Sequence, residues 1–129
     1  LGAAVINMDD EFGRELAREV RDHVCVWGYS LQSDVSDFED CADYLVYAKE
    51  IEPFERGSHL SVVTPKGAGR FDVPLLGRFN VSNALAVLST LLVSQFTFDH
   101  AIKSLAAARS VDVVVDILDD EYMSVFVLE

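Results

Sequence analysis

The chain has 129 residues, half of them hydrophobic, and a mean hydropathy of +0.21. This is enough apolar material for one domain with a buried core, which excludes an intrinsically disordered chain. The net charge is −12, from 22 acidic and 10 basic residues. The sequence therefore lacks a basic surface for nucleic acid, and an anionic membrane surface is disfavoured for the same reason.

Cysteine usage and the start of the sequence predict a cytoplasmic protein. Cys25 and Cys41 lie sixteen positions apart, form no C-x-x-C pair and are too few for a disulfide scaffold, so we expect two reduced thiols. The opening LGAAVINMDDEFG lacks the basic region of a signal peptide, and no apolar run approaches the ~20 residues that span a bilayer. Because Leu1 is not an initiator methionine, we expect a piece of a longer protein.

The first thirty residues predict a strand–helix–strand unit. The apolar run Ala3–Asn7 is typical of a strand that is buried on both faces. A helix follows, with Asp9 or Asp10 as its N-cap. The segment HVCVWGYS, residues 23–30, predicts a second strand. This order implies a parallel pair of strands joined by a right-handed crossover.

The first predicted helix has one apolar stripe and one weak point. Phe12, Leu16 and Val20 recur every four residues and define one face of the helix. Gly13 lies inside this helix and should weaken it by about 1 kcal/mol relative to alanine.

The middle of the chain predicts a small antiparallel sheet at about residues 43–76, after an acidic loop. The run YLVYAKEIEPF ends at Pro53 and reads as a strand. The runs HLSVVT and RFDVPLL flank the turn PKGAG, in which Pro65, Gly67 and Gly69 favour a hairpin.

The last third predicts two helices and two strands. Gly77 ends the preceding strand, and a helix is expected over about 80–94. A second helix should begin after Thr97 as N-cap, with Ile102 and Leu105 facing inward. The runs VDVVVDIL and YMSVFVLE predict strands on either side of a DDE turn.

Together these elements predict an α/β fold. It consists of a partial, mostly parallel sheet with flanking helices, to which the small antiparallel sheet is added. We assign residues 1–109 to the main body of this fold. Residues 110–129 are assigned to divergent C-terminal strands of the same compact domain.

The stretch INMDDE is the first candidate site. Asn7, Asp9 and Asp10 follow a buried parallel strand, and ligands of open α/β sheets bind beyond the carboxyl ends of such strands. Aspartates there can hold a ribose hydroxyl or a metal ion. Alternatively, Asp9 and Asp10 only cap the helix and complement its dipole, and the spacing alone favours this second interpretation.

The stretch GRFNVSN is the second candidate site. Asn80, Ser82 and Asn83 can satisfy the free N–H groups of the first helical turn. Arg78, beside the start of the helix, can bind an anion. One asparagine would be enough for a cap, so the excess leaves an amide free to read a ligand such as a purine edge. Surplus capping with one solvated arginine explains the pattern equally well.

The remaining patterns predict neither a catalytic residue nor a metal site. TPKGAGR has its glycines and lysine in the wrong order for a phosphate loop and lies in a predicted hairpin. His23, His59 and His100 lack the spacing of metal ligands. The sequence also contains no G-x-S-x-G motif.

Two segments resemble the Mur ligases, the ATP-dependent enzymes that add amino acids to the UDP-N-acetylmuramoyl peptide of the bacterial cell wall. These segments are AAVINMDDEFGRELA and LLGRFNVSNALAVLSTLL, and the spacing between them agrees as well. The similarity covers about residues 3–109, which correspond to the second half of the family's central, ATP-binding domain. It is greatest to the ligase that adds diaminopimelate or lysine as the third residue.

The resemblance implies a nucleotide site with ATP and Mg²⁺ as cofactors of the parent enzyme. The family's helix-opening asparagines lie near adenine and match Asn80 and Asn83, of which Asn83 is the stronger candidate. Asn7, Asp9 and Asp10 match a strand-end motif on the nucleotide side of the sheet, to which we assign a supporting role. The implied partners are the UDP-N-acetylmuramoyl peptide and the incoming amino acid.

The sequence also departs from the family pattern. The phosphate loop G-T-N-G-K-T, the Mg²⁺-binding Glu and His, the modified lysine and the third-domain arginine motif are all absent. We therefore expect no ligase activity from these 129 residues alone. The alternative is a non-catalytic scaffold or interaction domain that pairs with a partner through its C-terminal strands.

Overall fold

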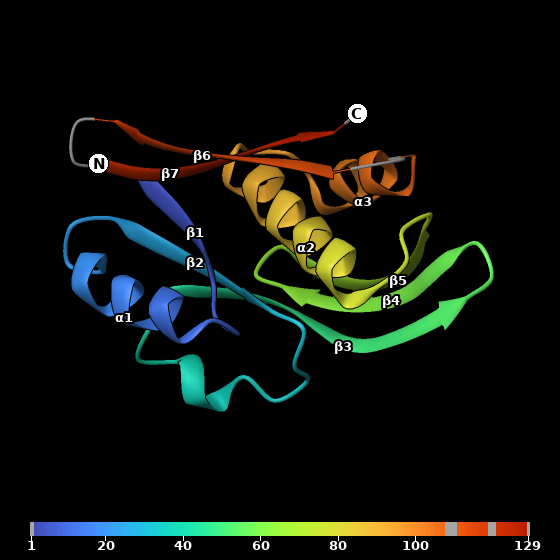
Figure 1. The fold of residues 1–129 in the computed structure, drawn as a ribbon, viewed down its shortest axis with the longest axis horizontal. Coiled ribbons are helices and arrows are strands. Elements are labelled where there is room, and N and C mark those ends of the chain that lie inside the picture. The colour runs from blue at the N-terminus through green and yellow to red at the C-terminus, as the bar shows by residue number, and fades with distance from the viewer. Residues whose placement is uncertain (1, 108–110, 119–120, 129) are drawn as a thin grey trace.

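The computed structural model describes residues 2–107, 111–118 and 121–128 and contains a five-stranded sheet with helices on both sides (Figure 1). The strands stand side by side in chain order, and the first three are mutually parallel while the last three are antiparallel. Their bounds are β1 Ala3–Asn7, β2 Cys25–Ser30, β3 Tyr44–Phe54, β4 Gly57–Thr64 and β5 Gly67–Val73.

The predicted α/β fold is confirmed, and its parallel and antiparallel parts form one continuous sheet. The long strand β3 joins them, because residues 44–47 pair with β2 and residues 47–54 pair with β4. A shift in register between Ala48 and Glu50 marks the transition. Beyond this point β3 extends past the end of β2.

Helix α1, Glu11–Val20, covers one face of the sheet, and α2, Arg78–Val93, covers the other. The alternation of side chains along β1 divides its residues between two apolar clusters. Val5 belongs to the cluster under α2, with Leu85 and Leu88. Ile6 belongs to the cluster under α1, with Ala17.

The buried face of α1 agrees with the predicted stripe at Leu16 and Val20, which pack against the core, and differs from it at Phe12. Phe12 is 70% exposed, whereas Gly13 and Ala17 are buried. The reason is a close approach of α1 to β1, because a Cβ atom at position 13 would lie 2.3 Å from the carbonyl oxygen of Asn7. Only glycine allows this approach, so Gly13 is a packing requirement and more than a weak point of the helix.

The predicted hairpin and the second predicted helix are confirmed. β4 and β5 flank a turn at Pro65 and Lys66, and α3 spans Phe98–Ala106. Thr97 caps α3 by accepting a hydrogen bond from the backbone N–H of His100 at 3.2 Å. The Phe98 ring packs over the two turn glycines, Gly67 and Gly69.

A Schellman motif ends α2. The backbone N–H of Gln95 donates to the carbonyl of Leu92 at 3.2 Å, and that of Phe96 donates to the carbonyl of Leu91 at 3.1 Å. Lys66 Nζ also donates to the Leu92 carbonyl at 2.6 Å, which places a cation at the negative end of the helix. Gln95 occupies the left-handed position of this motif, with φ at 74°.

Gln95→Gly should stabilise the chain by about 0.5–1 kcal/mol. Glycine adopts the left-handed conformation without the steric cost that a side chain imposes, and the Gln95 side chain is exposed. Chemical unfolding in urea measures the difference. Gln95→Ala is the control, since it shortens the side chain but keeps the Cβ atom, and it should not stabilise the chain. Equal unfolding midpoints for the glycine variant and the parent would contradict this account.

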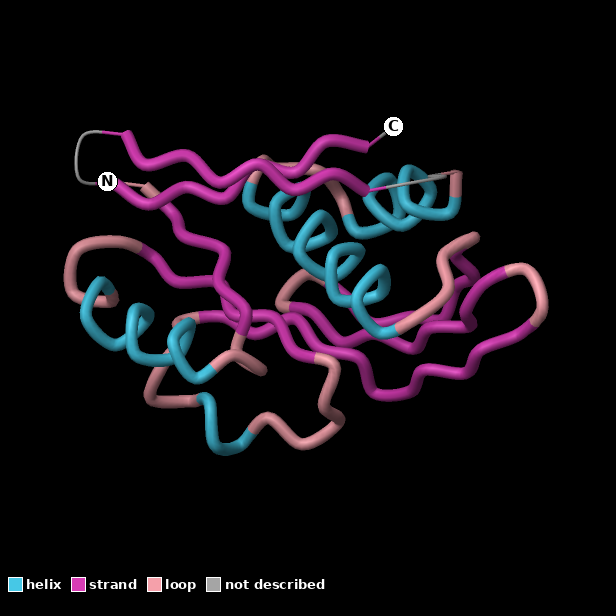
Figure 2. Tube along the Cα trace, viewed as in Figure 1, coloured by secondary structure: helices cyan, strands magenta, loops and turns pink. Residues whose placement is uncertain are grey.

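Two C-terminal strands form a second, two-stranded sheet. β6, Val111–Leu118, and β7, Glu121–Leu128, are antiparallel and lie against α2, with β7 also beside β1 (Figure 2). Both predicted strands are confirmed, while residues 119–120 of the predicted DDE turn lie outside the described residues. The domain boundary at residue 110 stays a prediction.

Candidate functional site

The carboxyl edge of the parallel strands holds the first group of predicted site residues. Asn7 ends β1 and is the register partner of Tyr29 in β2. Just beyond, the backbone N–H of Met8 donates to the Tyr29 carbonyl at 2.8 Å, so the two strand ends are held together. Asp9 and Asp10 follow in the link to α1.

Asp9 accepts three hydrogen bonds from the end of β2. Its Oδ1 accepts from Ser30 Oγ at 2.6 Å and from Gln32 Nε2 at 3.1 Å, and its Oδ2 accepts from the Leu31 backbone N–H at 2.8 Å. The Asn7 side-chain oxygen in turn accepts from the Asp9 backbone N–H at 2.9 Å. Asp9 therefore fastens the β1 end to the β2 end.

Asp10 is the N-cap of α1. Its Oδ1 accepts from the Phe12 backbone N–H at 3.1 Å, and its side chain is exposed. Of the two aspartates that the sequence predicts as possible N-caps, Asp10 is therefore the N-cap in the structure. All three polar residues of this stretch, Asn7, Asp9 and Asp10, have hydrogen bonds within the protein, which fits a supporting role at the edge.

The start of α2 is not capped as the sequence suggested. Gly77 is the N-cap residue, with φ at 88°, and none of the described side chains accepts a capping hydrogen bond from the first turn. Asn80 donates through Nδ2 to the Leu76 carbonyl at 2.9 Å, so it acts as a donor and does not cap the helix. The expectation that Asn80, Ser82 and Asn83 satisfy the first-turn N–H groups is therefore wrong.

A pocket of about 230 Å³ lies beside the first turn of α2. Arg78 and Val81 contribute to it from one side of the helix, together with Gly77. Its other lining residues come from β3 and β4: Ile51, Pro53 and Ser58. Asn80 and Asn83 lie about 100–160° around the helix from Arg78 and Val81, and the pocket is lined by the arginine but by neither asparagine.

The start of α2 lies at the edge of the sheet where β1 and β2 have their carboxyl ends. The pocket joins Gly77 to Ile51 and Pro53, and these two residues belong to the part of β3 that extends past β2. The helix then runs back over the sheet towards the amino ends of the strands (Figure 1). The two predicted groups of site residues therefore share one edge of the molecule.

Tyr29 is a residue of this edge that the sequence reasoning missed. It is 9% exposed and belongs to the cluster under α2. Burial raises its pKa to about 12, with smaller contributions from the charges of Asp9 and Asp10. A polar aromatic residue directly before the end of a buried strand is the signal that could have identified it.

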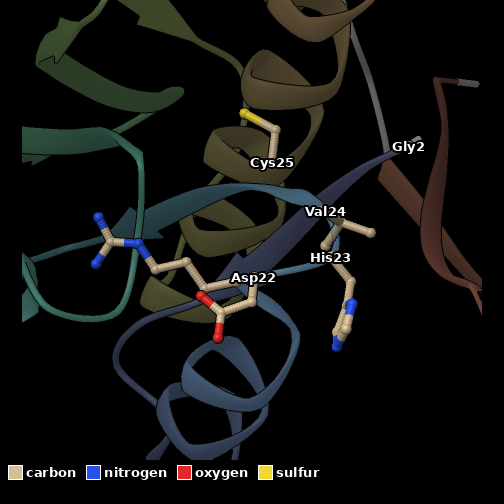
Figure 3. A pocket seen from close by; sticks show the side chains of 6 residues that line it. Gly2, Asp22, His23, Val24 and Cys25 are labelled. Carbon is tan, nitrogen blue, oxygen red and sulfur yellow. The ribbon is translucent and has the colours of Figure 1, made fainter.

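A different hollow lies at the opposite, amino edge of the parallel strands (Figure 3). Its volume is about 420 Å³, and it is lined by residues 21–25 and by Gly2. Burial raises the pKa of the Cys25 thiol there, with a smaller contribution from Asp43. Within the described residues, no three histidine, cysteine or acidic side chains are arranged to hold a metal ion.

The fold is an α/β domain whose parallel strands end at a polar carboxyl edge, and open α/β sheets in general bind ligands at such an edge. A family description, the Mur ligase middle domain, matches residues 1–91. The chain belongs to this family, which confirms the resemblance seen in the sequence.

Curated relatives of the chain include two ligases of the same name. The UDP-N-acetylmuramoyl-L-alanyl-D-glutamate–2,6-diaminopimelate ligase of Coxiella burnetii is 36% identical over 94% of this chain and 24% of its own length. The ligase of the same name from Ectopseudomonas mendocina is 43% identical over 81% of this chain and 20% of its own length. The chain thus spans about a fifth to a quarter of the curated relatives that it matches.

Solved structures agree on the fold. A structure of UDP-N-acetylmuramoyl-L-alanyl-D-glutamate–2,6-diaminopimelate ligase aligns with a TM-score of 0.70 at 24% identity, covering 90% of this chain and 24% of that one. A D-alanyl-D-alanyl-adding ligase from Acinetobacter baumannii aligns with a TM-score of 0.66 at 22% identity, covering 87% and 23%. None of the helices in the described residues is long and apolar enough to cross a membrane.

Proposed function

We propose that this chain contributes the adenosine-binding edge of an ATP-dependent ligase that adds an amino acid to a UDP-N-acetylmuramoyl peptide in the cytoplasm. The observation that carries the proposal is the family match over residues 1–91, where the F-N-x-x-N stretch opens α2 at the carboxyl edge of the sheet. The two relatives named above, diaminopimelate-adding ligases, support the choice of substrate class.

The chemistry of the proposed parent reaction sets what this chain can contribute. ATP phosphorylates a carboxylate, and the amine of the incoming amino acid attacks the acyl phosphate through a tetrahedral intermediate. Cationic groups and a metal ion must neutralise the transferring phosphoryl group. The described residues offer no cluster of metal ligands, so we assign no residue of this chain to Mg²⁺.

Asn83 and Asn80 are the residues that we assign to the base. An asparagine amide has a donor and an acceptor, which match the N6 amine and the N7 acceptor of adenine. Asn83 is half-buried, and its side chain forms no hydrogen bond with the described residues, whereas Asn80 already donates to Leu76. Asn83 is therefore the amide more available to a ligand, and Arg78 is the cation at the start of the same helix.

Titration of the purified chain with ATP tests this assignment. We expect the largest NMR shift changes at Asn80 and Asn83 and no turnover of ATP. Asn83→Ala should weaken binding about tenfold or more, because a well-placed amide contributes about 1–3 kcal/mol to reading a base. Ser82→Ala is the matched control and should stay within twofold of the parent.

The absence of binding at millimolar ATP would contradict the proposal and favour the scaffold alternative. In that alternative the separate sheet of β6 and β7 pairs with a partner chain through its edges. Size-exclusion chromatography tests this, since a strict monomer at high protein concentration argues against pairing of the chain with itself.

A further inference from the structure

Tyr29 is held rigidly at the carboxyl edge. It is the second-last residue of β2, is 9% exposed and packs in the cluster with Val5 and Val46 on the face of the sheet that α2 covers. Its backbone carbonyl accepts the hydrogen bond from Met8. Since neighbouring strands fix its backbone on both sides, its side chain has little freedom.

The phenol hydroxyl has no hydrogen-bond partner among the described residues, and it is not sealed inside the protein. Every fully buried side-chain nitrogen or oxygen in the described residues has a partner. Among the described residues the Tyr29 hydroxyl is neither hydrogen-bonded nor a fully buried atom without a partner, which is the pattern of a hydroxyl that reaches solvent from a buried ring. A rigid side chain with a polar tip at the surface suits ligand contact because little conformational entropy is lost on binding.

The surroundings of the hydroxyl select the kind of ligand. Asn7 is the register partner of Tyr29 on β1, and Asp9 and Asp10 are close enough for their charges to act on the phenol. Two carboxylates disfavour a phosphate at this point. The two carboxylates tolerate an uncharged ligand group. The hydroxyls and ring nitrogens of such a group can form a hydrogen bond with the phenol.

We infer that the Tyr29 hydroxyl contacts the uncharged, adenosine part of a nucleotide at this edge, as a specificity-determining group. The inference rests on the proposed function, because it assumes that a nucleotide binds here. It adds to the asparagines of α2 a contact from the sheet.

Tyr29→Phe tests the inference, because it removes one oxygen and keeps the buried ring. Calorimetric titration with adenosine and with ATP should show binding about fivefold weaker than for the parent, the effect of one neutral hydrogen bond. Tyr44→Phe is the matched control. Tyr44 is the partner of Trp27 at the amino end of the same sheet face, and its variant should change binding less than twofold.

A second measurement does not depend on a variant. With the tyrosine ring carbon that bears the hydroxyl labelled by ¹³C, the Tyr29 resonance should shift on addition of adenosine, and inorganic triphosphate should leave it unchanged. Unaltered adenosine and ATP affinity in Tyr29→Phe would overturn the inference while leaving the proposed function intact. No binding of ATP or adenosine by the parent chain would overturn both.

Discussion

Gly13→Ala should destabilise the chain by about 2 kcal/mol, although alanine is the better helix former. The added Cβ atom would lie 2.3 Å from the Asn7 carbonyl oxygen and 3.2 Å from Ile6 Cγ2. The oxygen belongs to the backbone of β1, so α1 must move away from the sheet to make room. Overpacking of this kind costs about 1–3 kcal/mol and exceeds the gain of about 1 kcal/mol in helix propensity.

Glu19 provides the matched control for this prediction. It lies exposed in the same helix, so Glu19→Ala should be more stable than Glu19→Gly by about 1 kcal/mol. Urea unfolding of the three variants and the parent measures all these differences. If Gly13→Ala were as stable as the parent or more so, the close contact between α1 and β1 would be wrong.

The order of strands and helices could be predicted because local patterns determine it. The apolar run of β1, the hairpin at Pro65 and the cap at Thr97 each depend on neighbouring residues. The inward face of α1 could be predicted only in part, at Leu16 and Val20, because the rest depends on the distance between the helix and the sheet. An exposed Phe12 beside a buried Gly13 follows from that distance and from no local preference.

The candidate site was predictable in position but less so in detail. The rule that ligands bind at the carboxyl ends of parallel strands led to Asn7 and Asp9. The hydrogen bonds of Asp9 reach residues at and just after the end of the next strand, more than twenty positions away in the chain. Gly77 takes the place of the expected asparagine caps. Tyr29 was not predicted, because its place opposite Asn7 and its closeness to the charges of Asp9 and Asp10 depend on the pairing of β1 with β2.

Asp9→Ala should destabilise the chain by about 2–4 kcal/mol, the largest effect expected at any predicted site residue. It removes three hydrogen bonds to a carboxylate, and such charged bonds contribute about 1.5–3 kcal/mol each before the structure relaxes. Ser30 is fully buried and would lose the acceptor for its hydroxyl. The ends of β1 and β2 would then separate more easily.

Asp10→Ala is the comparison variant. It measures the loss of a helix cap, whereas Asp9→Ala measures the loss of the hydrogen bonds that join β1 to β2. Asp10 makes one hydrogen bond at an exposed helix start, so its loss should cost only about 1 kcal/mol. The stability of Asp9→Asn should lie between those of Asp9→Ala and Asp10→Ala. In asparagine one of the two accepting oxygens is replaced by an NH₂ group, which would face hydrogen-bond donors. If Asp9→Ala kept full stability but weakened ATP binding, Asp9 would be a ligand residue first, and its bonds to Ser30 and Leu31 would contribute little to the fold.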